Sequence, residues 1–192
     1  MITWTEFSRQ QPALADAGRR QFYHFGIGLA FLATVRPDGA PRVHPVCPVI
    51  SEAGLHLLIV AGPKRQDLRR DGRFALHSET CPPPRQDDGF AVAGRAEQVT
   101  DAALRQVVRA RVLTERDGNV WPSFDEDVIF ELAIERALLT LTQADGQFPA
   151  GPTIWTAATG LAGNRWDPPV SLTGSSSGLA GSWVRREGSA TR

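Results

Sequence analysis

Three cationic side chains lie near the ends of two predicted strands, in residue types and spacing that suit the binding of an anion. Arg42 and His44 alternate along the apolar segment after the Pro37-Asp38-Gly39 turn, and Lys64 follows the apolar segment 55–61. Lys64 also opens KRQDLRRDG, which predicts one or two helical turns. The free N–H groups at a helix start, together with Lys, Arg and His side chains, suit a phosphate group. Two interpretations stay open: these cations bind an anionic ligand, or they are solvated charges at the rim of the fold.

A predicted hairpin brings these cations together. The segments 42–50 and 55–61 are expected to pair antiparallel around a turn at 51–54. If Ile50 pairs with Leu55, His44 lies opposite Ala61 and Arg42 opposite Pro63, and directly opposed residues share a face of a sheet. The cations therefore converge where the second strand of this hairpin enters the predicted helix.

The rest of the chain predicts further antiparallel strands with a few helices. A helix is expected from Pro12 to a stop at Gly26, and another after a cap at Thr100 or Asp101. The other strands are expected at 29–35, 73–79, 90–99 (with a bulge at its glycine), 127–142 and 152–157. Short strands at this spacing predict a mainly β fold, a small β-barrel with helical decorations.

Composition excludes several classes of protein. The formal net charge is zero and the isoelectric point is near 6.9, which lacks the basic footprint of a nucleic-acid-binding protein. No apolar run reaches the roughly 20 residues that span a membrane. The first residues lack the pattern of a signal peptide, so a cytoplasmic protein is expected.

The two cysteines and the C-terminal segment each leave a question open. Cys47 and Cys81 could be buried thiols, a disulfide or reactive groups, and no dense Cys/His cluster predicts a metal site. One domain is expected over 1–158. Residues 159–192 are rich in Gly, Ser, Ala and Pro, and they predict a flexible tail.

The order of the motifs resembles the pyridoxamine 5'-phosphate oxidase-like proteins, the FMN-binding split-barrel family. The resemblance covers about residues 25–142 and rests on ATVRPDGAPRVHPV, GPKRQDLRRDGRFALHS and FAVAGRAEQVTD, in that order. It implies a split β-barrel and a homodimer. It also implies a cofactor in a cleft shared by two subunits, which is FMN or, in some branches, a deazaflavin cofactor or heme.

The resemblance also implies a set of site residues. Lys64 matches the lysine that binds the flavin phosphate, and Arg42 matches a second phosphate contact. His77 either reaches the cofactor or is an ordinary barrel histidine. The residues expected to line the cofactor are Arg42, Val43, His44, Pro45, Val46, Ile59, Val60, Ala61, Lys64 and His77.

No residue is predicted to be a catalytic acid or base. Glu52, Asp67 and Asp71 are expected to be exposed turn or helix-face residues, and His24 and His56 to be structural or surface residues. This suits a protein whose cofactor performs the hydride chemistry.

The expected function is that of an FMN-dependent oxidoreductase acting on a small molecule. The Arg- and His-bearing C-terminal motif of true pyridoxamine-phosphate oxidases is not found, so a vitamin substrate is not expected. Two alternatives remain open: a deazaflavin-dependent reductase of the same fold, and a non-catalytic flavin- or heme-binding protein.

Overall fold

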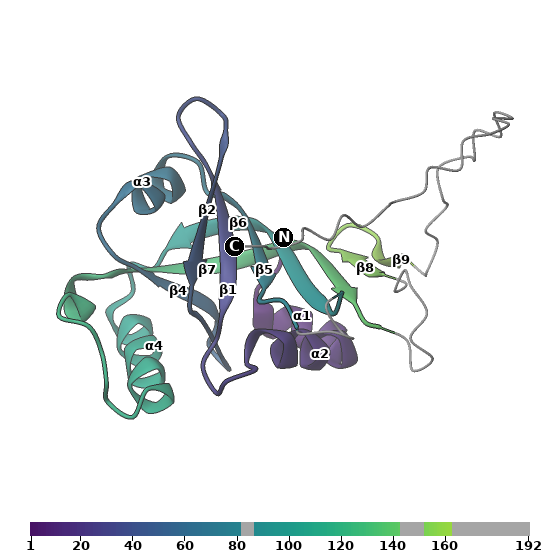
Figure 1. The fold of residues 1–192 in the computed structure, drawn as a ribbon, viewed down its shortest axis with the longest axis horizontal. Coiled ribbons are helices and arrows are strands. Elements are labelled where there is room, and N and C mark those ends of the chain that lie inside the picture. The colour runs from purple at the N-terminus through teal and green to yellow at the C-terminus, as the bar shows by residue number, and fades with distance from the viewer. Residues whose placement is uncertain (82–86, 143–151, 163–192) are drawn as a thin grey trace, which may run out of the picture.

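The computed structural model describes residues 1–81, 87–142 and 152–162, and its fold is mainly antiparallel sheet (Figure 1). The helices are α1 (Trp4–Gln10), α2 (Pro12–Phe22), α3 (Pro63–Arg70), α4 (Ala102–Glu115) and the short 3₁₀ helix η1 (Phe124–Glu126). The strands are β1 (Ala30–Val35), β2 (Pro41–Val46), β3 (Pro48–Ser51), β4 (Gly54–Ile59), β5 (Arg73–Ser78), β6 (Gly89–Gln98), β7 (Val128–Thr140), β8 (Thr153–Thr156) and β9 (Gly160–Ala162). The predicted mainly β fold is confirmed.

The sheet curls back on itself. Its strands follow the order β2-β1-β5-β6-β7-β4-β3, and β8 and β9 extend it from β7. The two ends of this order, β2 and β3, are consecutive in the chain and are joined by Cys47 alone. The ends of the sheet must therefore meet, and the chain closes the barrel at a corner where the hydrogen-bonded ladder is interrupted.

The predicted hairpin register is right near its turn and wrong near the cations. Ile50 pairs with Leu55 as expected, but the ladder stops at Pro48. Beyond that point β2 pairs with β1 across the Pro-Asp-Gly turn, which places His44 opposite Leu32 rather than Ala61. Pro48 has no N–H to donate, and the tight turn supplies β2 with another partner, so the strand changes neighbours at Cys47.

Helices cover different parts of the barrel. In Figure 1, α1 and α2 lie together below the sheet. The helix α3 lies at the upper left near β2, and α4 lies at the lower left beside β4. The segment that forms α1 had no predicted element. Its Trp4 and Phe7 are buried and pack against Phe90 and Trp155, which ties the N-terminus to the main core.

A second, smaller apolar cluster lies between the sheet and α4. Its buried members are Val49, Val99, Val108, Val112, Phe124 and Ile129. The bulge predicted in β6 is present as a register shift between Ala93 and Gly94. No helix among the described residues is long and apolar enough to span a membrane.

The predicted boundary at residue 158 falls within the turn between β8 and β9. Trp155 in β8 is buried, so the hairpin of β8 and β9 packs against the main core. Most of the predicted flexible tail, residues 163–192, lies outside the described residues.

Candidate functional site

Arg42 points toward the inner side of the sheet and is tied to α3. Its Nε donates to Asp67 Oδ2 at 2.8 Å, and Thr34, directly opposite on β1, donates to the same oxygen at 3.0 Å. Asp67 is only 2% exposed, so its expected exposure is wrong. Burial raises the pKa of Asp67, but hydrogen bonds from Arg42, Thr34 and Arg70 outweigh that effect and lower it overall.

His44 shares the inner face with Arg42, two residues earlier on the same strand. Its Nε2 is buried and has no hydrogen-bond partner among the described residues. Burial lowers the pKa of this imidazole, and the positive charges of Lys64 and Arg42 lower it further. His44 is therefore a neutral ring with one unused polar atom, close to two cations.

Lys64 stands in the first turn of α3, after Gly62 at its N-cap and Pro63. It lines a cavity of about 200 Å³ together with Val46, Cys47 and Trp121. Burial lowers its pKa, while Asp127 and Cys47 act in the opposite direction. Lys64 takes part in none of the salt bridges found within the described ranges, such as those of the neighbouring Arg65 and Asp67.

The chain holds Lys64 in place through its neighbour Arg65. The Arg65 guanidinium donates to the Ile59 carbonyl at 2.9 and 2.6 Å and lies 3.6 Å from Asp127 Oδ1. Asp127 is buried and also accepts a hydrogen bond from Trp121 Nε1 at 2.7 Å. Sequence reasoning missed this pair, because no local pattern links residue 65 to a carboxylate at the start of β7.

The other predicted site residues fall into two groups. Val46 and Ile59 belong to the main core, and Val46, the less deeply buried of the two, also lines the cavity beside Lys64. Exposed residues of the outer face or of strand ends form the second group: Val43, Pro45, Val60, Ala61 and His77.

His77 is separated from Arg42, His44 and Lys64. It lies on β5, with β1 between it and β2, and its Nδ1 lies 2.7 Å from the Ser78 carbonyl oxygen. Phe31 on β1 pairs with both His77 and Pro45, so these three side chains share the outer face of the sheet. The side chain of His44 lies on the inner face. The structure thus groups Arg42, His44 and Lys64, and leaves His77 on the other side of the sheet.

Both cysteines are free, which excludes the disulfide that the sequence left open. Cys47 is at the barrel corner beside Lys64, and Cys81 is buried with its Sγ 3.6 Å from His24 Nε2. The parts of the chain that the structure describes contain no group of three or more His, Cys, Asp and Glu side chains arranged to hold a metal ion.

The arrangement suits a phosphate monoester. Within the described residues, Lys64 offers an ammonium group without a salt bridge at a cavity wall, and the two terminal nitrogens of Arg42 form no hydrogen bond. The unpartnered Nε2 of His44 adds a third polar group. Charge-assisted hydrogen bonds of this kind are the strong ones in proteins.

One comparison with known proteins identifies the family, and another shows the fold. The sequence model described as pyridoxamine 5'-phosphate oxidase matches residues 20–141, well over half of the chain. No curated protein matches the chain. Similar solved structures include a heme-binding protein from Mycobacterium smegmatis, with 17% identity over 73% of this chain and 57% of that chain (TM-score 0.56).

Two further structures are HutZ from Vibrio cholerae, described as a heme storage protein, and an F420 reductase. HutZ is 17% identical over 72% of this chain and 99% of its own, with a TM-score of 0.52. The F420 reductase is 19% identical over 62% of this chain and 94% of its own, with a TM-score of 0.47. At these identities a likeness shows the fold alone. The fold is a split β-barrel, and with the match over 20–141 this chain belongs to the pyridoxamine 5'-phosphate oxidase-like family.

Proposed function

We propose that this protein is an FMN-dependent oxidoreductase that acts on a small organic molecule. One observation carries the proposal: Lys64, half-buried and without a salt-bridge partner within the described residues, lines a cavity at the start of α3, close to His44. The family membership supports the cofactor class, and the free cation supports a cofactor that carries a phosphate group.

The chain's own residues have distinct roles in this proposal. Lys64 and Arg42 bind the phosphate, and Asp67 orients Arg42 through the 2.8 Å ion pair. The backbone of β2 at Val43 and Pro45 lies against the flavin ring of FMN, as does the end of β4 after Ile59. FMN would supply hydride transfer when bound, so the protein is required only to bind, orient and exclude water.

A non-catalytic heme- or flavin-binding role is the second candidate, and one observation favours it. The unpartnered Nε2 of the neutral His44 is the kind of atom that ligates heme iron. A deazaflavin cofactor is the third candidate, because its phosphate group would suit Lys64 equally well.

Identification of the ligand that purifies with the protein tests these candidates directly. We expect a flavin absorption spectrum, and the mass of FMN in the supernatant after denaturation. A heme spectrum would instead support the second candidate, and the mass of a deazaflavin cofactor the third. If the purified protein is colourless and takes up none of the three ligands when they are added, the proposed function is wrong.

We also propose that the protein is a homodimer, and the outer face of the sheet supports this. The segments 42–50 and 55–61 are apolar on both faces in the sequence, although a small barrel has a single interior. The second apolar face is partly covered within the chain, because Val49 and Leu58 pack beneath α4. Its other part stays exposed. Val43 is 60% exposed, and Phe31, on the same outer face of β1, is 38% exposed.

Light scattering over micromolar concentrations is expected to give the mass of a dimer. The double variant Phe31→Glu/Val43→Glu is expected to be monomeric, because charges there oppose burial of the face. Val107→Glu is the matched control, since Val107 is 52% exposed on α4, away from this face. A monomeric wild type, or equal dissociation of the control, would contradict the proposal.

A further inference from the structure

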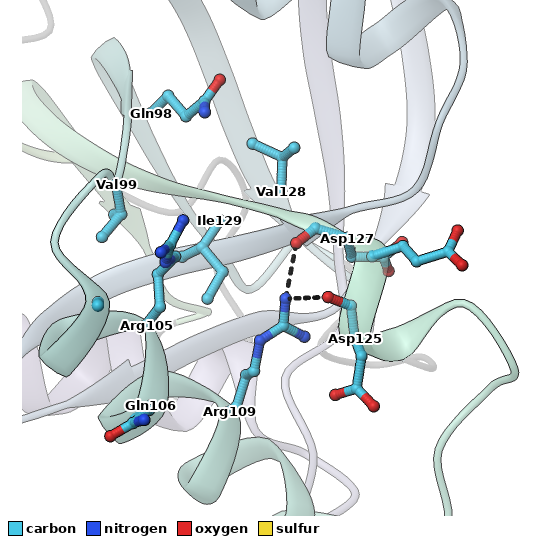
Figure 2. Close-up of a pocket in the computed structure, with 11 residues that line it drawn as sticks. Gln98, Val99, Arg105, Gln106, Arg109, Asp125, Asp127, Val128 and Ile129 are labelled. Carbon is cyan, nitrogen blue, oxygen red and sulfur yellow. Dashed lines mark hydrogen bonds between the residues drawn. The ribbon is translucent and has the colours of Figure 1, made fainter.

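A second cavity, of about 420 Å³, lies between α4 and the start of β7, apart from the one that Lys64 lines. Its volume falls in the range of small-molecule sites, roughly 300–1,000 Å³. The floor is apolar and consists of Val99, Val128 and Ile129, of which Val99 and Ile129 are buried (Figure 2). Amide side chains of Gln98 and Gln106 stand at its sides.

One wall of this cavity is fixed in advance by Arg109. Its guanidinium donates to the backbone carbonyls of Phe124, Asp125 (3.0 Å) and Asp127 (2.9 Å). It also lies over the Phe124 ring, 5.1 Å from the ring centroid. These contacts bind η1 to α4 along one wall of the cavity, and they leave Arg109 few donors for a ligand.

Arg105, unlike Arg109, has donors that the described residues leave unused. It lies one turn before Arg109 on the same face of α4, and its side chain points into the cavity beside Ile129 (Figure 2). Within the described ranges it forms no salt bridge and no side-chain hydrogen bond. Arg105 is exposed to solvent, so a ligand that enters the cavity can reach its guanidinium.

Three acidic residues, Asp125, Glu126 and Asp127, also line the cavity, and none of them forms a salt bridge with Arg105 within the described ranges. Asp127 is buried and faces Trp121 Nε1, Ser123 and Arg65. The carboxylate of Asp125 points away from both arginines in Figure 2, and only its backbone carbonyl contacts Arg109. Within the described residues, the guanidinium of Arg105 is therefore the cation of this cavity with unused donors, and it lies beside an apolar floor. Glu126, which is exposed, likewise forms no salt bridge there.

We propose that this cavity binds a small organic carboxylate, held by Arg105 with its apolar part on Val99, Val128 and Ile129. The planar guanidinium matches a carboxylate in a two-bond arrangement. One free cation over an apolar floor suits a singly charged ligand with a hydrocarbon body better than a phosphate dianion. The proposal does not rest on the cofactor proposal, because the contacts that it assigns to the ligand do not involve Arg42, His44 or Lys64. The two cavities are linked through Asp127, which lines this one and lies 3.6 Å from Arg65.

Benzoate, with its neutral isostere benzamide, tests this site on the full chain as purified. Amide resonances of ¹⁵N-labelled protein are followed during titration. We expect saturable benzoate shifts confined to the first half of α4 and the start of β7, and none with benzamide. Arg105→Gln is expected to weaken benzoate binding about tenfold or more, because a charge-assisted pair is lost. Arg95→Gln, which removes an exposed charge on β6 outside the cavity, is expected to leave binding unchanged.

Several results would overturn the proposal. They are the absence of saturable shifts at α4, equal binding of benzamide, or equal losses in Arg105→Gln and Arg95→Gln. Displacement of benzoate by inorganic phosphate at the same resonances would assign the cavity to phosphate instead of a carboxylate. Shifts at Lys64 and β2 alone would show that benzoate occupies the cofactor site. None of these outcomes depends on which cofactor the protein carries.

Discussion

Replacing Lys64 by alanine is expected to weaken FMN binding by roughly ten- to a hundredfold and to leave riboflavin binding nearly unchanged. A hydrogen bond to a charged group contributes about 1.5–3 kcal/mol, and each 1.4 kcal/mol is a factor of ten in affinity. Riboflavin lacks the phosphate that Lys64 is proposed to bind. A difference between the two ligands therefore separates a phosphate contact from a general loss of structure.

The fold is expected to tolerate this change. Lys64 is half-buried and takes part in no salt bridge within the described part of the chain, so its removal leaves no buried carboxylate unpaired. Arg69→Ala is the matched control, since Arg69 is an exposed cation on the same helix. Both ligands are titrated by flavin fluorescence against wild type and both variants. Unchanged FMN affinity in Lys64→Ala, or equal losses for FMN and riboflavin, would remove Lys64 from the site.

Arg42 is a poorer probe of the same site, for a physical reason. Its guanidinium is 2.8 Å from Asp67, and the Asp67 side chain is 3% exposed. Arg42→Ala would leave a buried carboxylate with one charge partner fewer, which is strongly destabilising. A loss of FMN binding in that variant could come from the lost phosphate contact or from a disturbed α3. Lys64→Ala avoids this ambiguity, because Lys64 has no salt-bridge partner within the described residues.

Local chemistry explains what the sequence could predict. The Asp-Gly turn, Gly62 and Pro63 at the start of α3 and the Asp101 cap of α4 each act within a few residues, and the turn and the two helices are present. The position of Lys64 at a helix start followed from the same local signals. The likeness of the ordered motifs then indicated the family, which the match over residues 20–141 confirms.

Pairings over long distances explain what the sequence could not predict. The partner of β2 depends on the corner at Cys47, where the strand leaves β4 for β1, and no residue pattern marks that exchange. The burial of Asp67 depends on Arg42 and Thr34, 25 and 33 residues away. The ion pair of Arg65 with Asp127 joins residues that are adjacent only because α3 packs near the start of β7.

His56 was expected to be structural or at the surface, and the structure buries it completely. It lies on β4 between Val49 and Glu131, and neither ring nitrogen has a hydrogen-bond partner within the described residues. Burial lowers the pKa of this imidazole to about 4, although the nearby backbone of Gly54 lessens the shift. The folded protein therefore holds His56 neutral over a pH range in which the unfolded chain protonates it.

This difference predicts a loss of stability in mild acid. The pKa of histidine in an unfolded chain is about 6.5, so the unfolded state binds the proton first and the free energy of unfolding falls as the pH drops below that value. The loss continues until the pH reaches the folded value near 4. At about 1.4 kcal/mol per pH unit, it amounts to roughly 2 kcal/mol by pH 5 and roughly 3 kcal/mol in full.

The variant His56→Leu is expected to remove most of this pH dependence. Leucine has no titratable group, and an apolar side chain beside Val49 leaves no unpaired nitrogen, so stability at pH 7 should change little. Glu131, opposite His56, has a pKa raised first by burial and then by Glu97, and its protonation in acid stabilises the fold. Comparing wild type with the variant at each pH largely cancels that contribution.

Urea unfolding at pH 7 and pH 5 measures the effect. Wild type should lose roughly 2 kcal/mol more than His56→Leu between these two values. His77→Gln is the control, because His77 is exposed and its removal should leave the wild-type pH dependence in place. Equal losses in wild type and His56→Leu would show that His56 is not the group that titrates. If His77→Gln reduced this loss as much as His56→Leu does, the burial of His56 would not be its cause, because exposed His77 and buried His56 would then have the same effect.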